Sequence, residues 1–383
     1  MSYKIPFCRV SLEGTELDNL AASLRSGYIA GDGQFTKKCQ NEIERLIDAR
    51  SVLLTTSCTS ALELSALLLD IGPGDEVILP SFTFVSTANA FVLRGARPVF
   101  VDIRPDTLNL DEGLVAQAIT PKTRAIVPVH YAGVGCDMDA LGRLADMHDL
   151  RVVEDAAQGF LATYRGRQLG AIGDIGCFSF HETKTFTCGE GGAVVLNRPD
   201  LVRRAEILRE KGTNRSAFFR GEVDKYTWID VGSSYLPSDL LAAVLLAQID
   251  CREGIIDKRR AIFERYAMGL SPLADRGRVA LCRVPEDCTV NYHMFYFLAA
   301  DRDERTALLA HMRKQGILAT FHYVPLHTSP FARRYGSVPS LPVTESVADR
   351  LVRLPLYNSL TEDEQEQVIR QVVSFYDSYV PAT

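Results

Sequence analysis

The chain has 383 residues, 46% of them hydrophobic, which suffices to bury a large core in two domains, or in one large and one small domain. Its formal net charge of -6 and its lack of a dense basic run argue against a nucleic-acid partner. No apolar stretch reaches the length of a membrane span, and the first residues lack the apolar core of a signal peptide. We therefore expect no membrane insertion.

The nine cysteines are scattered along the chain, and none of them forms a Cys-x-x-Cys pair. This spacing gives no support for a zinc site, so we expect no metal. An odd number of cysteines without a secretory signal predicts reduced thiols in a cytoplasmic protein.

Residues 1–50 predict a polar helix, a glycine-containing loop at 26–33 and an amphipathic helix at 42–50. Gly31 and Gly33 would permit close approach of the loop backbone to a ligand, and Tyr28 of this loop is a candidate substrate contact. An ordinary connecting loop explains the same glycines equally well.

Residues 51–200 alternate between short apolar runs and amphipathic stretches of about ten residues, a pattern typical of βαβ units and a mostly parallel sheet. Ligands of such sheets bind beyond the carboxyl ends of the strands. The loops after Leu54, Leu79, Val129 and Glu154 therefore form the walls of the candidate site. The predicted strands are 51–54, 76–79, 98–103, 124–129, 151–154, 177–180 and 193–196, and the predicted helices are 61–70, 83–94, 139–148 and 199–211.

The remaining residues predict a long helix from 238 to about 270, with Ser238 as its N-cap. A smaller α/β unit follows, with strands near 277–283 and 291–299 and helices at 303–315 and 362–378. We expect a large domain at residues 1–245 and a small C-terminal domain at residues 246–383.

Lys184 lies in the connection between two predicted apolar strands, and this connection also holds several hydroxyl groups and three glycines. Apolar surroundings lower the pKa of a lysine and free its amine to attack a carbonyl group, as a Schiff base requires. The alternative is a surface lysine on a tight hairpin.

Three other strand ends carry groups that complement such an amine. Residues 55–60 join a strand to a helix, where free backbone N–H groups and hydroxyls suit a phosphate, although ordinary N-capping explains them as well. Asp155 ends a buried strand and needs a cation such as a protonated ring nitrogen, whereas Glu154 points to the opposite face. Phe84 offers an aromatic face for a flat cofactor or a core contact. Together these are the parts of a pyridoxal phosphate (PLP) enzyme.

The same motifs resemble the nucleotide-sugar aminotransferases, which are PLP enzymes of fold type I. The resemblance covers nearly the whole chain and implies an aspartate-aminotransferase-like α/β fold, with a mostly parallel central sheet between helices and a smaller C-terminal α/β domain. Residues 82–106 and 211–238 are most similar to the transaminases that form dTDP-4-amino-4,6-dideoxygalactose. The motifs that carry the resemblance are 56–62, 80–87, 154–158, 178–184 and 189–192.

The resemblance implies roles for individual residues. Lys184 would form the Schiff base and move the proton, and Asp155 would pair with the pyridinium nitrogen. His181 would belong to the substrate pocket. The other implied cofactor contacts are Gln158 at the ring hydroxyl, Phe84 on the ring face, and Cys58, Thr59 and Ser179 at the phosphate.

The chain departs from the family where many relatives have Gly-Tyr-Asn-Tyr-Arg and residues 232–236 are Gly-Ser-Ser-Tyr-Leu. In those relatives the Asn reaches the phosphate across a dimer interface, a role that Ser234 can take. Leu236 cannot replace a guanidinium, so Asn214 and Arg215 become the candidates for substrate binding. The resemblance also implies a homodimer in which residues 211–235 complete the partner's active site.

The implied reaction is transfer of the amino group of L-glutamate to C4 of a dTDP-4-keto-6-deoxyhexose, for synthesis of a cell-surface polysaccharide such as lipopolysaccharide or enterobacterial common antigen. Amination to the gluco epimer, or at C3, stays open, and so does a non-catalytic PLP-binding protein. A sugar dehydratase would have histidine in place of Lys184. A nicotinamide-dependent oxidoreductase or epimerase would need Gly-x-Gly-x-x-Gly after the first strand, and residues 51–60 lack it.

Overall fold

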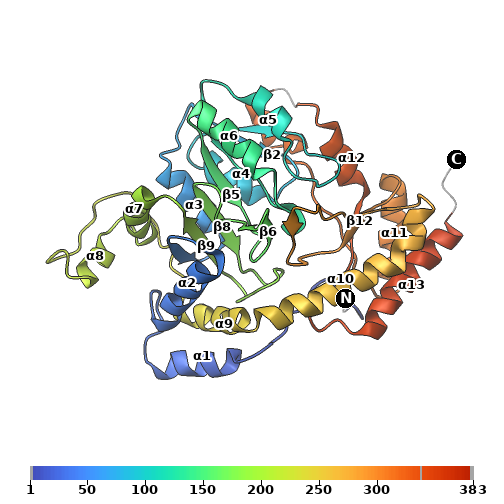
Figure 1. The fold of residues 1–383 in the computed structure, drawn as a ribbon, viewed down its shortest axis with the longest axis horizontal. Coiled ribbons are helices and arrows are strands. Elements are labelled where there is room, and N and C mark those ends of the chain that lie inside the picture. The colour runs from blue at the N-terminus through green and yellow to red at the C-terminus, as the bar shows by residue number, and fades with distance from the viewer. Residues whose placement is uncertain (1–2, 337–338, 380–383) are drawn as a thin grey trace.

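A seven-stranded sheet forms the centre of the larger part of the molecule (Figure 1). The computed structural model describes residues 3–336 and 339–379. All strands of this sheet run parallel except β9, which is antiparallel to both of its neighbours, and the predicted mostly parallel sheet is thereby confirmed. In spatial order the strands are β1 (Val52–Thr55), β9 (Gly192–Leu196), β8 (Ile175–Ser179), β5 (Arg151–Asp155), β4 (Thr123–Ile126), β2 (Glu76–Pro80) and β3 (Arg97–Val101).

Helices cover both faces of this sheet because alternate strand residues are apolar on each side. In β1, for example, Leu53 packs into the core beneath one set of helices, while Val52 and Leu54 pack into the core on the other face. The first set is α3 (Cys58–Leu68), α4 (Val85–Val92) and α7 (Pro199–Arg209). The second is α2 (Gln34–Ile47), α5 (Glu112–Ala118), α6 (Met138–His148) and α9 (Asp239–Asp250), with α1 (Glu16–Arg25) outside α9.

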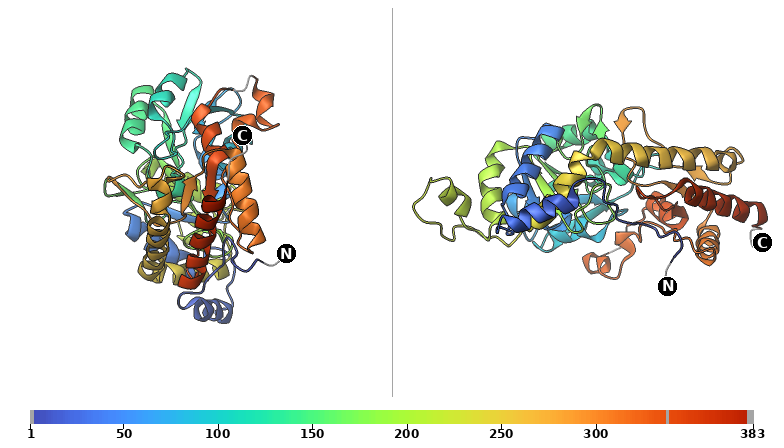
Figure 2. Two further views of the ribbon diagram at one scale, coloured as in Figure 1. Left: turned by 90° about the vertical axis from the view of Figure 1, so that its right-hand side faces the viewer. Right: turned by 90° about the horizontal axis from the view of Figure 1, so that it is seen from below.

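A second core, around a three-stranded antiparallel sheet, occupies the C-terminal part of the chain. Figures 1 and 2 show it at the end of the molecule opposite α8 (Arg215–Phe219). The boundary at residues 245/246 stays a prediction. The elements are β10 (Ala280–Leu281), β12 (Tyr296–Leu298), β13 (Leu351–Arg353), α10 (Arg252–Asp275), α11 (Arg302–Lys314), α12 (Pro342–Arg350) and α13 (Glu362–Ser378). The short strands β6 (Thr163–Tyr164), β7 (Arg167–Gln168) and β11 (Cys288–Thr289) form a third sheet.

Element boundaries differ from the expected ones at several places. The Ser238 N-cap is confirmed, since its hydroxyl accepts a hydrogen bond from Leu240 N, but the long helix breaks at Cys251 into α9 and α10. The helix expected at 42–50 begins at Gln34, where the buried carboxylate of Asp239 accepts the free backbone N–H groups of Phe35 and Thr36. Neither α12 nor β13 was predicted from the sequence.

None of the helices in the described ranges combines the length and the apolar character that a bilayer crossing needs. All nine cysteines lie within these ranges and are free thiols.

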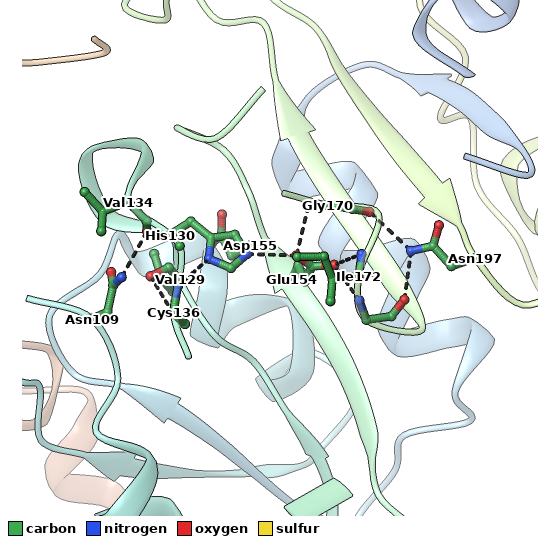
Figure 3. A network of polar contacts seen from close by, with 12 residues as sticks. Asn109, Val129, His130, Val134, Cys136, Glu154, Asp155, Gly170, Ile172 and Asn197 are labelled. Carbon is green, nitrogen blue, oxygen red and sulfur yellow. Dashed lines mark hydrogen bonds and ion pairs between the residues drawn. The ribbon is translucent and has the colours of Figure 1, made fainter. Parts of the chain in front are cut away.

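The end of β5 is held in place by the buried carboxylate of Glu154. Glu154 points away from Asp155, as the strand alternation predicts, and its oxygens accept backbone N–H groups of Gly170 (2.8 Å), Ile172 (2.7 Å) and Gly173 (2.6 Å) (Figure 3). A fourth contact, of 2.9 Å, joins Oε2 of Glu154 to Nε2 of His130. Because Cys136 N donates to Nδ1 of His130, a ring proton lies on Nε2, which donates to the carboxylate. This network fixes the turn that leads into β8.

We predict that Glu154→Gln lowers the free energy of unfolding by about 1–3 kcal/mol, because an amide places its own N–H groups against backbone donors inside the protein. The urea midpoint measures the loss. Glu366→Gln, at an exposed glutamate of α13, is the control and should leave the midpoint unchanged. Equal midpoints for both variants would contradict the structural role of Glu154.

Candidate active site

A cavity of about 510 Å³ lies beyond the carboxyl ends of the central strands, where the sheet faces the C-terminal part of the chain. Its walls include the predicted loops after β1, β2, β4 and β5. The structure therefore brings together most of the predicted site residues. Those that line the cavity are Cys58, Thr59, Phe84, Asp155, Gln158, Ser179, His181 and Lys184.

Lys184 is presented by the connection between the antiparallel strands β8 and β9. Backbone hydrogen bonds hold this connection in shape, from Phe180 N to Gly191 O (2.8 Å) and from Lys184 N to His181 O (2.9 Å). The lysine is half-buried, and burial lowers the pKa of its amine. The charge of Arg353 lowers this pKa further, whereas Cys58 and Asp155 raise it. The surroundings are thus those of an amine that loses its proton more readily than an ordinary lysine.

Asp155 is buried at the end of β5, with its carboxylate on the cavity side of the sheet. Oδ2 accepts the hydroxyl of Thr87 at 2.7 Å, and Oδ1 accepts Ala157 N at 3.2 Å. Thr87 in turn contacts the hydroxyl of Thr83 at 2.8 Å. None of these partners carries a charge, so the carboxylate remains available to a cationic group in the cavity.

The N-terminus of α3 forms a cradle of backbone and hydroxyl groups on another wall. Ser57 caps the helix by accepting Ser60 N at 3.1 Å, and Thr59 contacts the hydroxyl of Ser86 at 2.7 Å. Gly192 faces the backbone of Ser57 and Cys58 so closely that a Cβ there would clash with both residues. The helix start is therefore capped and also open to the cavity, since Cys58 and Thr59 line it, and free N–H groups at such a place suit an anion.

The remaining predicted contacts differ in how they are held. Gln158 is fixed on both sides, since its oxygen accepts Ala132 N (2.7 Å) and its nitrogen donates to the hydroxyl of Tyr323 (3.0 Å). Phe84 is 59% exposed at the start of α4 and is therefore not a core residue. Nδ1 of His181 accepts Thr183 N at 3.3 Å.

Four predicted residues lie outside this cavity in a single chain. Ser234 is exposed and forms an isolated bridge with Glu210, and Asn214 accepts Thr227 N at 2.7 Å beside α8. Tyr28 and Arg215 line a different cavity, of about 830 Å³, between the loop at residues 26–33 and α7 and α8. One chain alone does not bring these four residues to Lys184.

Several of the residues that sequence reasoning missed come from the C-terminal part of the chain. His293, His322, Tyr323 and Arg353 line the wall that faces Lys184 and Asp155. Burial, with the charges of Arg353 and Lys184, lowers the pKa of His322 to about 2. His293 is buried as well, and its pKa lies well below the ordinary value. Both imidazoles are therefore neutral. Of the segments that contribute these four residues, only the strand at 291–299 was predicted from the sequence.

Known proteins with similar sequences and structures show the family of this chain. A family model described as the DegT/DnrJ/EryC1/StrS aminotransferase family matches residues 10–373. The aminotransferase TlmJ from Streptoalloteichus hindustanus is 31% identical to this chain over 99% of each chain, with a TM-score of 0.89. DesV from S. venezuelae, solved in complex with a ketimine intermediate, is 34% identical over 100% of each chain, with a TM-score of 0.88.

Cofactor-bound structures are also similar to this chain. Spr1654 from Streptococcus pneumoniae, solved in its PLP form, is 26% identical over 100% of each chain, with a TM-score of 0.89. A structure of the same protein in its pyridoxamine phosphate (PMP) form is equally similar, with a TM-score of 0.89. These forms indicate pyridoxal phosphate as the cofactor, and the lysine, the buried acid and the anion cradle of this cavity suit that group. The chain therefore belongs to the DegT/DnrJ/EryC1/StrS aminotransferase family and is a PLP-dependent sugar aminotransferase.

Proposed function

We propose that the enzyme transfers the amino group of L-glutamate to C4 of a dTDP-4-keto-6-deoxyhexose and forms dTDP-4-amino-4,6-dideoxygalactose. The observation that carries the proposal is the meeting of Lys184, Asp155 and the α3 cradle in one cavity. The choice of sugar rests on the closer likeness of residues 82–106 and 211–238 to transaminases that make this product. We further propose that the product serves cell-surface polysaccharide synthesis, as in lipopolysaccharide or enterobacterial common antigen.

We assign the cofactor contacts as follows. Pyridoxal phosphate, when bound, supplies the electron sink that transamination requires. Asp155 would hold the protonated ring nitrogen, because its present partners are neutral. The backbone and hydroxyls at the start of α3 would hold the phosphate. The other assigned contacts are Gln158 at the ring hydroxyl, Phe84 at the ring face and Ser179 at the phosphate.

Lys184 would hold the cofactor covalently and carry the proton during the reaction. Both tasks need an amine that is unprotonated near neutral pH. Burial lowers the pKa of Lys184 and so favours the unprotonated form. His181, with Nδ1 fixed by Thr183, would face the sugar.

We place the reaction in the cytoplasm. The nine cysteines, all free thiols in this structure, support a reducing compartment.

We propose a homodimer with shared active sites. The segment around α8 exposes a set of apolar side chains, including the chain's single tryptophan, which is 78% exposed. Several exposed large apolar side chains within one short segment are typical of a protein interface, and a second copy is the partner that the family resemblance supplies. Ser234, Asn214, Arg215 and Tyr28 would then act in the partner's site. The exposed apolar residues are Phe218, Phe219, Tyr226, Trp228, Ile229 and Val231.

The substrate assignment is tested by incubating the PLP-loaded enzyme with L-glutamate and a panel of dTDP- and UDP-linked keto sugars. We expect turnover of the dTDP-4-keto-6-deoxyhexose and an axial amine at C4 in the NMR spectrum of the product. Lys184→Met is the control and should lose at least about 10²–10⁴-fold in rate. An equatorial C4 amine, a C3 amine or a preference for UDP sugars would refute the proposed substrate.

The lowered pKa of Lys184 predicts a pH-dependent difference in stability between the cofactor-free wild type and Lys184→Met. The pKa of this lysine is lower in the folded than in the unfolded chain, so the folded wild type binds fewer protons between the two values. Its free energy of unfolding, relative to the variant, should therefore rise with pH until about 10.4, the ordinary lysine pKa. Urea unfolding at several pH values measures this trend. A difference that is constant or falls with pH would contradict it.

Shared sites predict that two inactive variants rescue each other. Lys184→Met lacks the amine, and Asn214→Ala with Arg215→Ala lacks the contribution to the partner, so a mixed dimer has one intact site. Activity should return in up to about half of the heterodimer sites by two-fold symmetry. Each variant incubated alone is the control. If native mass spectrometry detects heterodimers and activity stays absent, each chain builds its own site.

A further inference from the structure

A buried histidine joins the end of β2 to the C-terminal part of the chain, outside the cavity described above. A hydrogen bond of 2.6 Å connects the hydroxyl of Ser81, the residue after β2, to Nδ1 of His327, and the same oxygen accepts His327 N at 3.0 Å. Nε2 of His327 lies 3.1 Å from a carboxylate oxygen of Glu345 on α12. Ser81, His327 and Glu345 are called the Ser81 link below.

The order of groups in the Ser81 link is hydroxyl, imidazole and carboxylate, which also occurs in serine hydrolases. A hydrolase needs its hydroxyl open to a substrate. The side chain of Ser81 is instead fully buried, and none of the three residues lines the 510 Å³ cavity. The role of the link therefore lies in what it holds in place.

The link lies at one end of an irregular segment, residues 321–325. At the other end, Thr320 and Arg353 exchange backbone hydrogen bonds of 3.1 and 2.7 Å, and at the link Leu326 N donates to the carbonyl of Ser81 at 3.1 Å. Between these two anchors, no backbone–backbone hydrogen bond joins residues 321–324 to the other described residues. The course of the segment is therefore fixed mainly at its ends.

Tyr323 is the residue of this segment that reaches the cofactor side of the cavity. Its hydroxyl accepts Nε2 of Gln158 at 3.0 Å, and its ring packs edge-on against Phe82, the neighbour of Ser81, with 5.4 Å between the ring centres. The amide nitrogen of Gln158 has two protons, and Tyr323 takes one of them. Because Oε1 of Gln158 already accepts Ala132 N, the amide cannot turn over, and its second proton stays available to a group in the cavity.

The carboxylate of the link is itself held by the sheet. Asp102, the residue after β3, accepts the backbone N–H groups of Val343 (3.0 Å) and Thr344 (2.8 Å) in the first turn of α12. Glu345 comes next in this helix and also accepts Leu341 N at 3.3 Å. The half-exposed carboxylate is thus presented to His327 from a helix start that the end of β3 fixes.

We propose that Ser81, His327 and Glu345 are positioning residues that hold Tyr323 against Gln158 and thereby orient the Gln158 amide toward the cofactor ring. Their effect is indirect, because only Tyr323 and Gln158 line the cavity. This inference rests on the contact proposed above between Gln158 and the ring hydroxyl. Loss of the link frees one end of the segment, and Gln158 then loses the partner that holds its nitrogen.

Hydrogen exchange of single backbone amides in the PLP-loaded enzyme tests whether the link holds the segment. Ser81→Ala removes the partner of the buried Nδ1 of His327 but keeps the carbonyl that Leu326 N donates to. We expect the Leu326 amide to exchange about 5- to 150-fold faster in this variant, because an unsatisfied buried group favours local opening. The Thr320 amide, at the other end of the segment, should keep its wild-type rate.

The apparent dissociation constant of PLP tests whether the link acts through Tyr323. Tyr323→Phe should raise this constant about 2- to 12-fold, as expected for the loss of one neutral hydrogen bond. Ser81→Ala should raise it as well. The double variant should bind PLP within about twofold of Tyr323→Phe alone, because both substitutions remove the same contact.

Ser65→Ala is the matched control. Ser65 on α3 is also fully buried, its hydroxyl donates to Ala61 O at 2.8 Å, and it does not line the cavity. Its replacement removes a buried hydroxyl from the same side of the molecule. Exchange of the Leu326 amide and the dissociation constant of PLP should both stay at their wild-type values.

Replacements of the other two residues keep the test open if Ser81→Ala does not fold. His327→Gln keeps a polar group for Glu345 and loses the one for Ser81, whereas His327→Asn does the reverse. Both variants should lose part of the protection at Leu326. Glu345→Gln still offers an acceptor oxygen and should stay closer to the wild type than Glu345→Ala.

Several results would overturn the proposal. Wild-type exchange at Leu326 in both Ser81→Ala and His327→Gln would show that the link does not hold the segment. Additive effects of Ser81→Ala and Tyr323→Phe on PLP binding would show that it does not act through Tyr323. Effects matched by Ser65→Ala would make its role one of general stability.

Gln158→Ala separates this proposal from the cofactor contact on which it rests. If this variant binds PLP as tightly as the wild type, the contact between Gln158 and the ring hydroxyl fails, and the positioning role fails with it. If Gln158→Ala weakens PLP binding and Tyr323→Phe does not, the contact stands and the positioning role alone is refuted.

Discussion

The active site depends on two neighbouring acids that leave the end of β5 in opposite directions. Glu154 is surrounded by donors, namely three backbone N–H groups and the imidazole of His130, whereas Asp155 meets neutral partners at the edge of the cavity. The first acid is satisfied within the protein, and its hydrogen bonds fix the turn into β8. That strand then leads to Lys184. The acid and the amine of the site are thus positioned by one strand end and its hydrogen bonds.

The distribution of charge gives the two walls of the cavity different tasks. The sheet presents the acid, the helix start and the lysine, which are the groups that we propose as the cofactor contacts. The C-terminal wall presents Arg353 with two neutral imidazoles, His322 and His293. A wall that keeps its histidines uncharged concentrates its positive charge on a single guanidinium. On this wall, an anionic group therefore meets its positive charge at one place.

Sequence reasoning found the sheet side of the site because topology determines it. Parallel strands place their carboxyl ends along one edge, so Asp155, Gln158 and Thr59 could be assigned to one site before their contacts were known. Arg353 was not predicted as a site residue because β13 has only three residues, too few for an alternating pattern. In addition, nothing in its local sequence distinguishes a cavity arginine from a surface one. Asn214 and Arg215 lie outside the cavity in one chain, so their proposed part in the site requires a second chain, which no pattern within one chain describes.

The approach of Gly192 to the backbone of Ser57 and Cys58 bears on how this enzyme tolerates genetic variation. An anion cradle made mainly of main-chain N–H groups keeps its shape whichever small side chains surround it. Changes at Thr59 would then act in small, graded steps. A single methyl group at residue 192 would instead press on the cradle's own backbone. The tolerance of the cradle to mutation therefore differs between positions. It is high where hydroxyl side chains line the cradle and absent at Gly192, where only a hydrogen atom fits.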